Sequence, residues 1–280
     1  MELLKLYFRI DIDNINFYSN IARFEYKNYN YVLIKDNNPN FELLNHIFNY
    51  IDIKKPILNI YNNYVTRYDN EYYFLFYDNN NKINDIDVIK FLSKPLYIYN
   101  NNLRDKWCYK NDYIEYQITQ FGSKYAILRK SINYIIGLSE IAIQLLNTIN
   151  LDNCYSSLVH KRMTNSMFDL ENPLNICFDY RIRDVSEYIK YMFFYEDKEI
   201  FNELVLKIKL NIEEYKLLFA RLLFITPYYD MYEKIIDGDI NEKEIKLIIN
   251  KLDKYEEFIK KIYLYLKRYI NIDNIELFNN

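Results

Sequence analysis

The sequence predicts an α+β fold with a small β-rich N-terminal part and a mainly helical C-terminal part. Over residues 1–100, short β-rich runs alternate with polar Asn and Asp turns, and one segment has helical spacing. From Leu103 onward, apolar residues recur at intervals of three and four almost to the end of the chain. We therefore predict two domains, 1–100 and 101–280, which meet at the turn Asn100–Asn102.

The N-terminal part is expected to consist of strands with one helix between them. The predicted strands are Tyr7–Ile12, Ile21–Tyr26, Tyr31–Lys35, Ile57–Ile60 and Tyr72–Tyr77. The helix covers Phe41–Ile51, where apolar side chains are three and four positions apart.

The C-terminal part is expected to be built from long helices. One covers Trp107–Gln120, and Ser131 is a good N-cap for a second that ends near Asn147. Gly137 lies inside this second helix, which predicts a close approach of another backbone there. Three further helices are predicted at Glu199–Leu210, Ile212–Phe224 and Asn241–Ile270.

Between these helices lies a stretch of different character. Two short apolar runs, Ser156–His160 and Leu174–Tyr180, flank a polar loop, and a helix follows at Arg183–Phe194. Asp184 and Glu187 form a D-x-x-E pattern at the start of that helix, which predicts a capping box.

Composition and charge exclude several classes of protein. The formal net charge is −3 with acidic and basic residues mixed, so no basic patch marks a nucleic-acid partner. No signal peptide and no apolar run long enough to span a bilayer is visible, which predicts synthesis in the cytoplasm. Three scattered cysteines and two histidines indicate neither a disulfide framework nor a metal site of the Cys or His type.

Three segments resemble the spore-coat kinase-like family of the CotS and YutH type. They are SINYIIGLSEIAIQLL (Ser131–Leu146), RDVSEYIKYMF (Arg183–Phe193) and EEYKLLFARLLFITPYYDMYE (Glu213–Glu233). The first and third are most similar to the YutH branch, and the likeness covers about Trp107 to Glu233. The resemblance implies a two-lobe, protein-kinase-like fold of the aminoglycoside-phosphotransferase type. It also implies association with the bacterial spore coat, with other coat proteins as partners.

Active enzymes of this fold carry a catalytic loop H-G-D-x-x-x-x-N, in which the Asp serves the attacking hydroxyl and the Asn helps to hold magnesium. If His160 is the motif's His, Arg162 replaces the Asp and Met167 replaces the Asn. Arginine accepts no proton and methionine is no magnesium ligand. In the alternative interpretation, a shifted loop recruits Asn165 or Asp169 instead.

The resemblance also assigns roles to residues outside the loop. Asp179 matches a metal-binding Asp, although an Asp at the end of a strand is equally often a turn former. Asp184 would tie down the catalytic loop, a structural role. Lys35 would anchor nucleotide phosphates with Glu42 as its partner; otherwise it is an exposed lysine at a strand end.

These residues favour a catalytically degenerate kinase-like protein, a pseudokinase, with a binding or structural role. No glycine precedes Gly122, so a Gly-rich loop over nucleotide phosphates is excluded from the N-terminal part. Two alternatives stay open, and both need ATP. One is an active phosphotransferase for small molecules or proteins that uses Asp179 to hold magnesium. The other is a nucleotide sensor that binds ATP without transferring phosphate.

Overall fold

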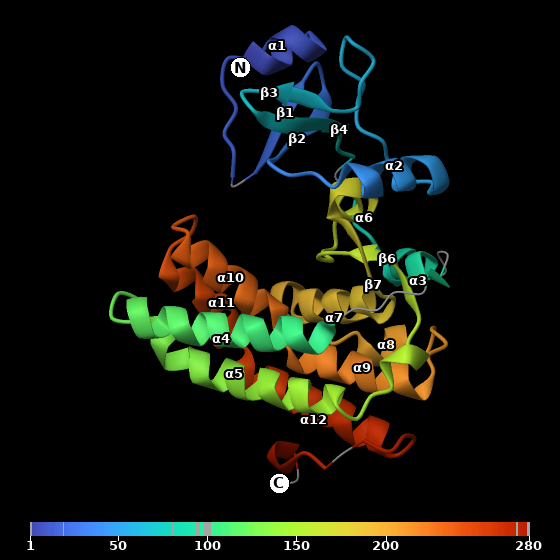
Figure 1. Cartoon of the computed structure of the whole chain (residues 1–280), viewed down its shortest axis with the longest axis vertical. Helices are drawn as coiled ribbons and strands as arrows, with labels where there is room; N and C mark the ends of the chain where they lie inside the picture. The colour runs from blue at the N-terminus through green and yellow to red at the C-terminus, as the bar shows by residue number, and fades with distance from the viewer. Residues whose placement is uncertain are drawn as a thin grey trace. The chain divides into compact units, whose positions relative to one another are not determined.

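A computed structural model describes residues 2–18, 20–79, 81–92, 96–97, 102–272 and 274–278 (Figure 1). The chain forms two compact units. Unit 1 comprises Met1–Ile83 and Ser166–Cys177, and unit 2 comprises Asn84–Asn165 and Phe178–Asn280. The units therefore divide after Ile83, and part of the central loop belongs to unit 1. The turn Asn100–Asn102, where the sequence predicts the boundary, lies largely outside the described residues.

Unit 1 is built on an antiparallel sheet with the strand order β1-β2-β4-β3. Its strands are β1 (Ile21–Tyr26), β2 (Tyr29–Asp36), β3 (Thr66–Tyr68) and β4 (Glu71–Tyr77). Two hairpins are closed by two-residue turns: Lys27-Asn28 joins β1 to β2, and Asp69-Asn70 joins β3 to β4. All four of these turn residues have positive φ. Asn and Asp adopt this conformation more readily than most residues, which suits tight hairpins.

Both faces of this sheet are covered by helices. On one face Leu3 and Leu4 of α1 (Glu2–Phe8) pack with Leu33 and Leu75 of the sheet. On the other, Leu44 of α2 (Phe41–Tyr50) and Phe168 of α6 (Met167–Glu171) belong to a second core. The strand members of that core are Val32, Ile34, Phe74 and Phe76.

Two strand predictions in unit 1 are wrong. Tyr7 lies in the last turn of α1, and no strand is assigned to residues 9–12. Residues 57–60 also form no regular strand, although the Ile57 backbone N–H donates to the Leu75 carbonyl at 2.6 Å. In both segments the apolar residues pack against the sheet, but the segments themselves are not strands of it.

Unit 2 is mainly helical, so the structure confirms the predicted α+β class. Its longer helices are α3 (Asp85–Leu92), α4 (Leu103–Phe121), α5 (Ala126–Leu146), α7 (Ile182–Glu196), α9 (Ile212–Leu223), α10 (Thr226–Ile236) and α12 (Leu252–Lys267). Two shorter ones are α8 (Phe201–Val205) and α11 (Lys246–Ile249). Helix α9 packs against α5, α7 and α12, and its residues 217–223 are all buried.

A small sheet with the order β5-β6-β7 accompanies these helices. Its strands are β5 (Leu96–Tyr97), β6 (Ser156–His160) and β7 (Ile176–Tyr180), the last of which begins in unit 1. Short 3-10 turns lie at Leu151–Asn153, Pro173–Asn175, Glu242–Ile245 and Glu276–Phe278. β6 has the same bounds as the predicted apolar run Ser156–His160.

Helix α5 differs from its prediction at two residues. It begins at Ala126, so Ser131 lies inside it and is not an N-cap. The Ser131 hydroxyl instead donates to the Ile127 carbonyl at 3.1 Å and hydrogen-bonds the Tyr228 hydroxyl at 2.8 Å. Gly137 is exposed, and a Cβ built there would meet nothing within 4 Å. The predicted close approach of a backbone at Gly137 is therefore wrong.

The helices near the C-terminus are shorter than predicted. Of Glu199–Leu210 only α8 is α-helical, and Asn241–Ile270 divides into a 3-10 turn, α11 and α12. The prediction at Ile212–Phe224 is confirmed by α9, where Asn211 and Glu214 form a capping box.

Candidate functional site

The end of strand β6 is tied to helix α7 by a buried carboxylate. Asp184 Oδ1 accepts from the His160 backbone N–H at 2.7 Å, and Asp184 Oδ2 lies 2.7 Å from His160 Nδ1. Helix α7 begins at Ile182, so Asp184 is its third residue and its side chain caps no helix end. The predicted capping box with Glu187 is wrong. Asp184 thereby fixes His160, the last residue of β6, to helix α7.

Arg162, at the position of the catalytic Asp, forms a bidentate ion pair with Asp230 of α10. Its Nε and Nη2 atoms donate to the two carboxylate oxygens, and Nη1 donates to the Lys161 carbonyl at 2.7 Å. Burial alone would lower the pKa of Arg162, but the hydrogen bonds to Asp230 and the negative charges of Glu187, Asp230 and Glu233 together raise it. The position therefore carries a permanent positive charge that a carboxylate compensates.

Asp179, at the end of β7, lies between two guanidinium groups. Arg183 Nη1 donates to its Oδ2 at 2.7 Å, and Arg221 Nη2 of α9 donates to its Oδ1 at 2.8 Å. The Tyr180 backbone N–H also donates to Oδ1 at 2.7 Å, and the carboxylate is only 1% exposed. Burial would raise the pKa of Asp179, but Arg221 and Arg183 lower it to about 2.

Glu187 and Lys190 form a buried ion pair one turn further along α7. Lys190 Nζ lies 2.8 Å from Glu187 Oε1 and 3.1 Å from the Arg221 and Phe224 carbonyls, where α9 ends. The Thr226 hydroxyl, at the start of α10, donates to Glu187 Oε2 at 2.8 Å. Burial would raise the pKa of Glu187, but the charges of Lys190 and nearby arginines lower it to about 2. This pair joins three helices.

The other loop residues are divided between the units. In unit 2 the Asn165 amide donates to Glu196 at 2.7 Å, and the Tyr191 hydroxyl donates to Asn165 Oδ1 at 3.2 Å. Met167 and Asp169 belong to α6 in unit 1, where the Met167 backbone N–H donates to the Asn81 carbonyl at 2.8 Å. Asn165 and Asp169, the two substitutes considered for the missing ligand, thus lie on separate units.

Lys35 pairs with a different carboxylate from the predicted one. Its Nζ lies 3.0 Å from Glu71 Oε1 on the neighbouring strand β4, whereas Glu42 is exposed in the first turn of α2. The hydrogen bond from Tyr73 and then that from Lys35 lower the pKa of Glu71. The register of the sheet explains the Lys35–Glu71 ion pair. Lys35 of β2 lies opposite Tyr73 of β4, and Glu71 is on β4, two residues before Tyr73.

The residues in place do not fit a magnesium–nucleotide complex. Both oxygens of Asp179 accept hydrogen bonds from cationic groups, and a metal ion beside them would be repelled by the same guanidiniums. Arg162 adds a further positive charge where the fold's active enzymes have a carboxylate. Within the described ranges, no three Asp, Glu, His or Cys side chains come together as a set of metal ligands.

The sequence alone did not identify four of the residues that form these ion pairs: Lys190, Arg183, Arg221 and Asp230. The spacing of Lys190 three residues after Glu187 on the predicted helix is a local signal for an ion pair, whereas Asp179 precedes the helix that carries Arg183, so the helix rule does not cover that pair. Arg221 and Asp230 leave no such signal, because 42 and 68 residues separate them from Asp179 and Arg162. We refer to Arg162, Asp179, Arg183, Glu187, Lys190, Arg221 and Asp230 as the charge network.

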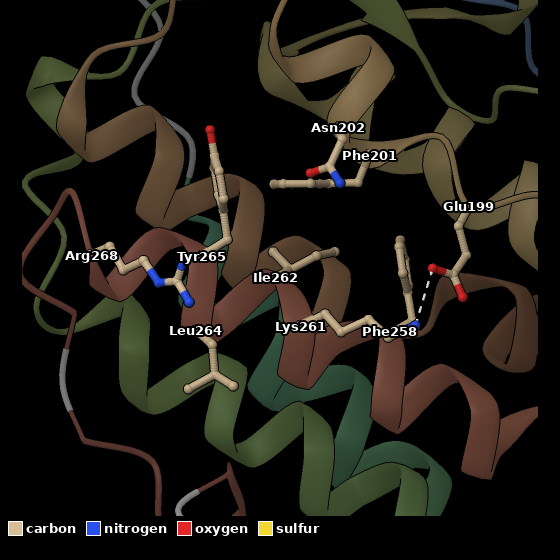
Figure 2. A pocket seen from close by; sticks show the side chains of 9 residues that line it. All are labelled: Glu199, Phe201, Asn202, Phe258, Lys261, Ile262, Leu264, Tyr265 and Arg268. Atoms are coloured by element: carbon tan, nitrogen blue, oxygen red, sulfur yellow. Dashed lines mark ion pairs between the residues drawn. The ribbon is translucent and has the colours of Figure 1, made fainter.

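A hollow of about 360 Å³ lies elsewhere in unit 2, between α8 and α12. Phe201, Phe258 and Tyr265 supply apolar walls, and Lys261 and Arg268 supply positive charge (Figure 2). Lys261 Nζ lies 3.5 Å from Glu199 Oε2 at the hollow.

None of the described helices has the length and apolar character that a membrane span requires.

The fold is that of the kinase-like phosphotransferases. An aminoglycoside phosphotransferase from Alicyclobacillus acidocaldarius superposes with a TM-score of 0.57 at 8% identity, over 92% of this chain and 93% of that one. The spectinomycin phosphotransferase APH(9)-Ia, in complex with ADP and spectinomycin, gives 0.54 at 14% identity, over 95% and 97%. The amicoumacin kinase hAmiN, in complex with AMP-PNP, Ca²⁺ and Ami, gives 0.52 at 12% identity, over 97% and 94%.

Within this class, the family described as "Spore coat putative kinase YutH" matches residues 104–262, which is more than half of the chain. The chain belongs to this family, as the three segments of the sequence indicate. No curated protein matches the chain in sequence.

Proposed function

We propose that the protein is a catalytically degenerate kinase, a pseudokinase, that serves as a binding or structural component of the spore coat. The observation that carries this proposal is that both carboxylate oxygens of Asp179 form ion pairs, one with Arg183 and the other with Arg221. A magnesium ligand has to present its oxygens to the metal, whereas this carboxylate uses them to join β7, α7 and α9. Arg162 supports the same conclusion, since it compensates Asp230 and accepts no proton.

Unit 1 supplies independent support for weak nucleotide binding. The segment before β1 contains helix α1 where a first strand was expected, and no glycine precedes Gly122. Two structural relatives are described with ADP or AMP-PNP, whereas in the described part of this chain the pairing of Asp179 with two arginines and of Arg162 with Asp230 disfavours holding such a ligand through magnesium.

The coat assignment comes from the family, and other coat proteins are the proposed partners. Cosedimentation tests it: the purified chain is mixed with isolated spore coats or, as the control, with vegetative cell walls. Selective recovery with the coats is expected. Equal recovery with both materials, or with neither, argues against a coat component.

Nucleotide binding tests the pseudokinase assignment. The chain is examined by thermal shift and calorimetry with ATP plus magnesium or manganese, and APH(9)-Ia is the positive control. A ligand at 100 times its dissociation constant would add about 2.7 kcal/mol to the free energy of unfolding. We expect no shift for this chain.

A shift would revive the two alternatives; a variant then tests whether Lys35 takes part in binding, and a phosphate-transfer assay separates the alternatives. Lys35→Met removes the candidate anchor, and Lys130→Met, an exposed lysine of α5, is the matched control. Loss of the shift in Lys35→Met alone, together with phosphate transfer by the wild type, would establish an active phosphotransferase. The same loss without transfer would establish a nucleotide sensor.

A further inference from the structure

Unit 1 contains a pocket that the charge network does not use. Its volume is about 450 Å³, within the range of small-molecule sites. It lies between α2, the segment 59–67 and strand β4, and six aromatic residues contribute to its lining: Tyr7, Phe41, Phe48, Tyr61, Tyr64 and Phe74. The floor is buried, because Phe74 is 1% and Leu44 4% exposed, whereas Phe41 and Tyr61 at the rim are 42% and 67% exposed.

The wall formed by segment 59–67 is fixed by one buried side chain. Asn59 Oδ1 accepts from the backbone N–H groups of Tyr61 and Asn63 at 2.9 and 3.1 Å. Its Nδ2 donates to Thr66 Oγ1 at 3.1 Å and to the Val65 carbonyl at 3.3 Å. The Ile60 backbone N–H donates to the Tyr7 carbonyl, which fastens the segment to α1. The pocket is therefore preorganised, which lowers the entropic cost of binding.

The lining defines the chemistry of a ligand. Aromatic walls favour a flat ring, which gains from edge-to-face and stacked contacts; Phe48 and Tyr64 already form a tilted pair 5.2 Å apart. Arg67 is the single charged residue among the described lining residues, and no carboxylate faces it from the pocket. The amides of Asn45 and Asn63 add hydrogen-bonding groups. A ring with an anionic substituent matches all three features.

We propose that this pocket binds a small aromatic molecule with a carboxylate or a similar anionic group. The ring lies among the aromatic walls, and the anion meets the Arg67 guanidinium. The hollow between α8 and α12 does not combine these features, because Glu199 places a negative charge beside Lys261 (Figure 2). The site rests on unit 1 alone and does not depend on the proposed function.

Calorimetry with four probes tests the site in the intact chain. 2-Naphthoate has the ring and the charge, 2-naphthylmethanol has the ring alone, and decahydronaphthalene-2-carboxylate has the charge on a saturated ring. 2-Naphthylmethylamine has the ring with the opposite charge. We expect 2-naphthoate to bind most tightly and the amine most weakly. Equal affinities for naphthoate and its saturated analogue, or tighter binding of the amine, would overturn the proposal.

Two exposed positions locate the binding. Arg67→Gln should weaken 2-naphthoate about tenfold and leave 2-naphthylmethanol unchanged, because only the charged contact is lost. Asn63→Trp should fill the pocket and abolish binding of both. Arg104→Gln, an exposed arginine at the start of α4, is the matched control and should change neither. Circular dichroism shows that each variant is folded; unchanged naphthoate binding in a folded Asn63→Trp would place the ligand elsewhere.

Discussion

At the scale of single residues, two positions of the candidate site carry ion pairs. Arg162, whose side chain is 38% exposed, forms a bidentate ion pair with Asp230, so the two charges compensate each other. At position 179 the carboxylate is retained, yet Arg183 and Arg221 take its oxygens. The Asp179 carboxylate thereby ties the end of β7 to helices α7 and α9.

Gly137 offers a prediction at this scale. It is exposed in the middle of α5, a Cβ at this position would have no neighbour within 4 Å, and glycine loses more conformational entropy on folding than alanine. Gly137→Ala should raise the free energy of unfolding by about 1 kcal/mol, measured by urea denaturation.

Gly238 is the matched control, because its φ of +84° lies in the left-handed region that disfavours alanine. Gly238→Ala should destabilise the protein by about 1 kcal/mol or more. A destabilising Gly137→Ala would mean that another backbone does approach α5, as the sequence alone suggests.

At the scale of elements, helix α7 organises unit 2 with charged residues on buried positions. Asp184, Glu187 and Lys190 follow one another at intervals of three and are at most 4% exposed. Lys190 reaches the carbonyls at the end of α9, where a positive charge complements the helix dipole. The Glu187 carboxylate accepts a hydrogen bond from the Thr226 hydroxyl, at the start of α10. One helix face thus fixes the ends of two others.

The Glu187–Lys190 pair gives a prediction for this helix. Lys190→Met should cost roughly 3 to 5 kcal/mol of unfolding free energy, because it leaves Glu187 buried and uncompensated. Adding Glu187→Gln should restore part of the loss, although the α9 carbonyls still lack their donor. Denaturant unfolding of both variants measures the difference. If the double variant is no more stable than the single one, the buried charge is not the source of the cost.

The start of α9 gives a second prediction for an element. Asn211 Oδ1 accepts from the Glu214 backbone N–H at 2.9 Å, and Glu214 returns a bond to the Asn211 N–H at 3.1 Å. Asn211→Ala should lower stability by about 1 kcal/mol. Asn133→Ala, at an exposed position inside α5, is the control and should stabilise slightly, since alanine is the better helix former. Equal effects of the two substitutions would argue against the cap.

At the scale of the whole molecule, the buried carboxylates set the stability in acid. The folded-state pKa values of Asp179 and Glu187, about 2, lie below their ordinary values of 3.8 and 4.5. The unfolded chain therefore binds their protons more readily. The stabilisation is complete above pH 4.5 and is lost as the pH falls toward 2, together on the order of 5 kcal/mol.

Unfolding measured between about pH 2 and 6 tests this dependence. The variant Glu187→Gln/Lys190→Met lacks one of the two carboxylates, so its stability should change less steeply with pH. The expected reduction approaches about 1.4 kcal/mol per pH unit, the slope for one proton. Identical slopes in the variant and the wild type would show that Glu187 titrates normally.

The sequence determined the fold class, several elements and the family, because these are written in local patterns. The 3.6-residue period located α2 and α9, the apolar run located β6, and three segments of unit 2 indicated the kinase-like class. The alignment of Arg162 with the catalytic Asp also comes from the sequence alone and stays a prediction. Such signals depend on neighbours in the chain and need no knowledge of packing.

Only the tertiary structure decided which charges meet. Nothing local distinguishes Asp230 as the partner of Arg162, or Arg221 as the partner of Asp179, since each pair forms by the packing of separate elements. For the same reason the sequence assigned Glu42 to Lys35, where sheet register selects Glu71. Periodicity defines which face of an element is buried, but the elements that cover that face are set by the fold as a whole.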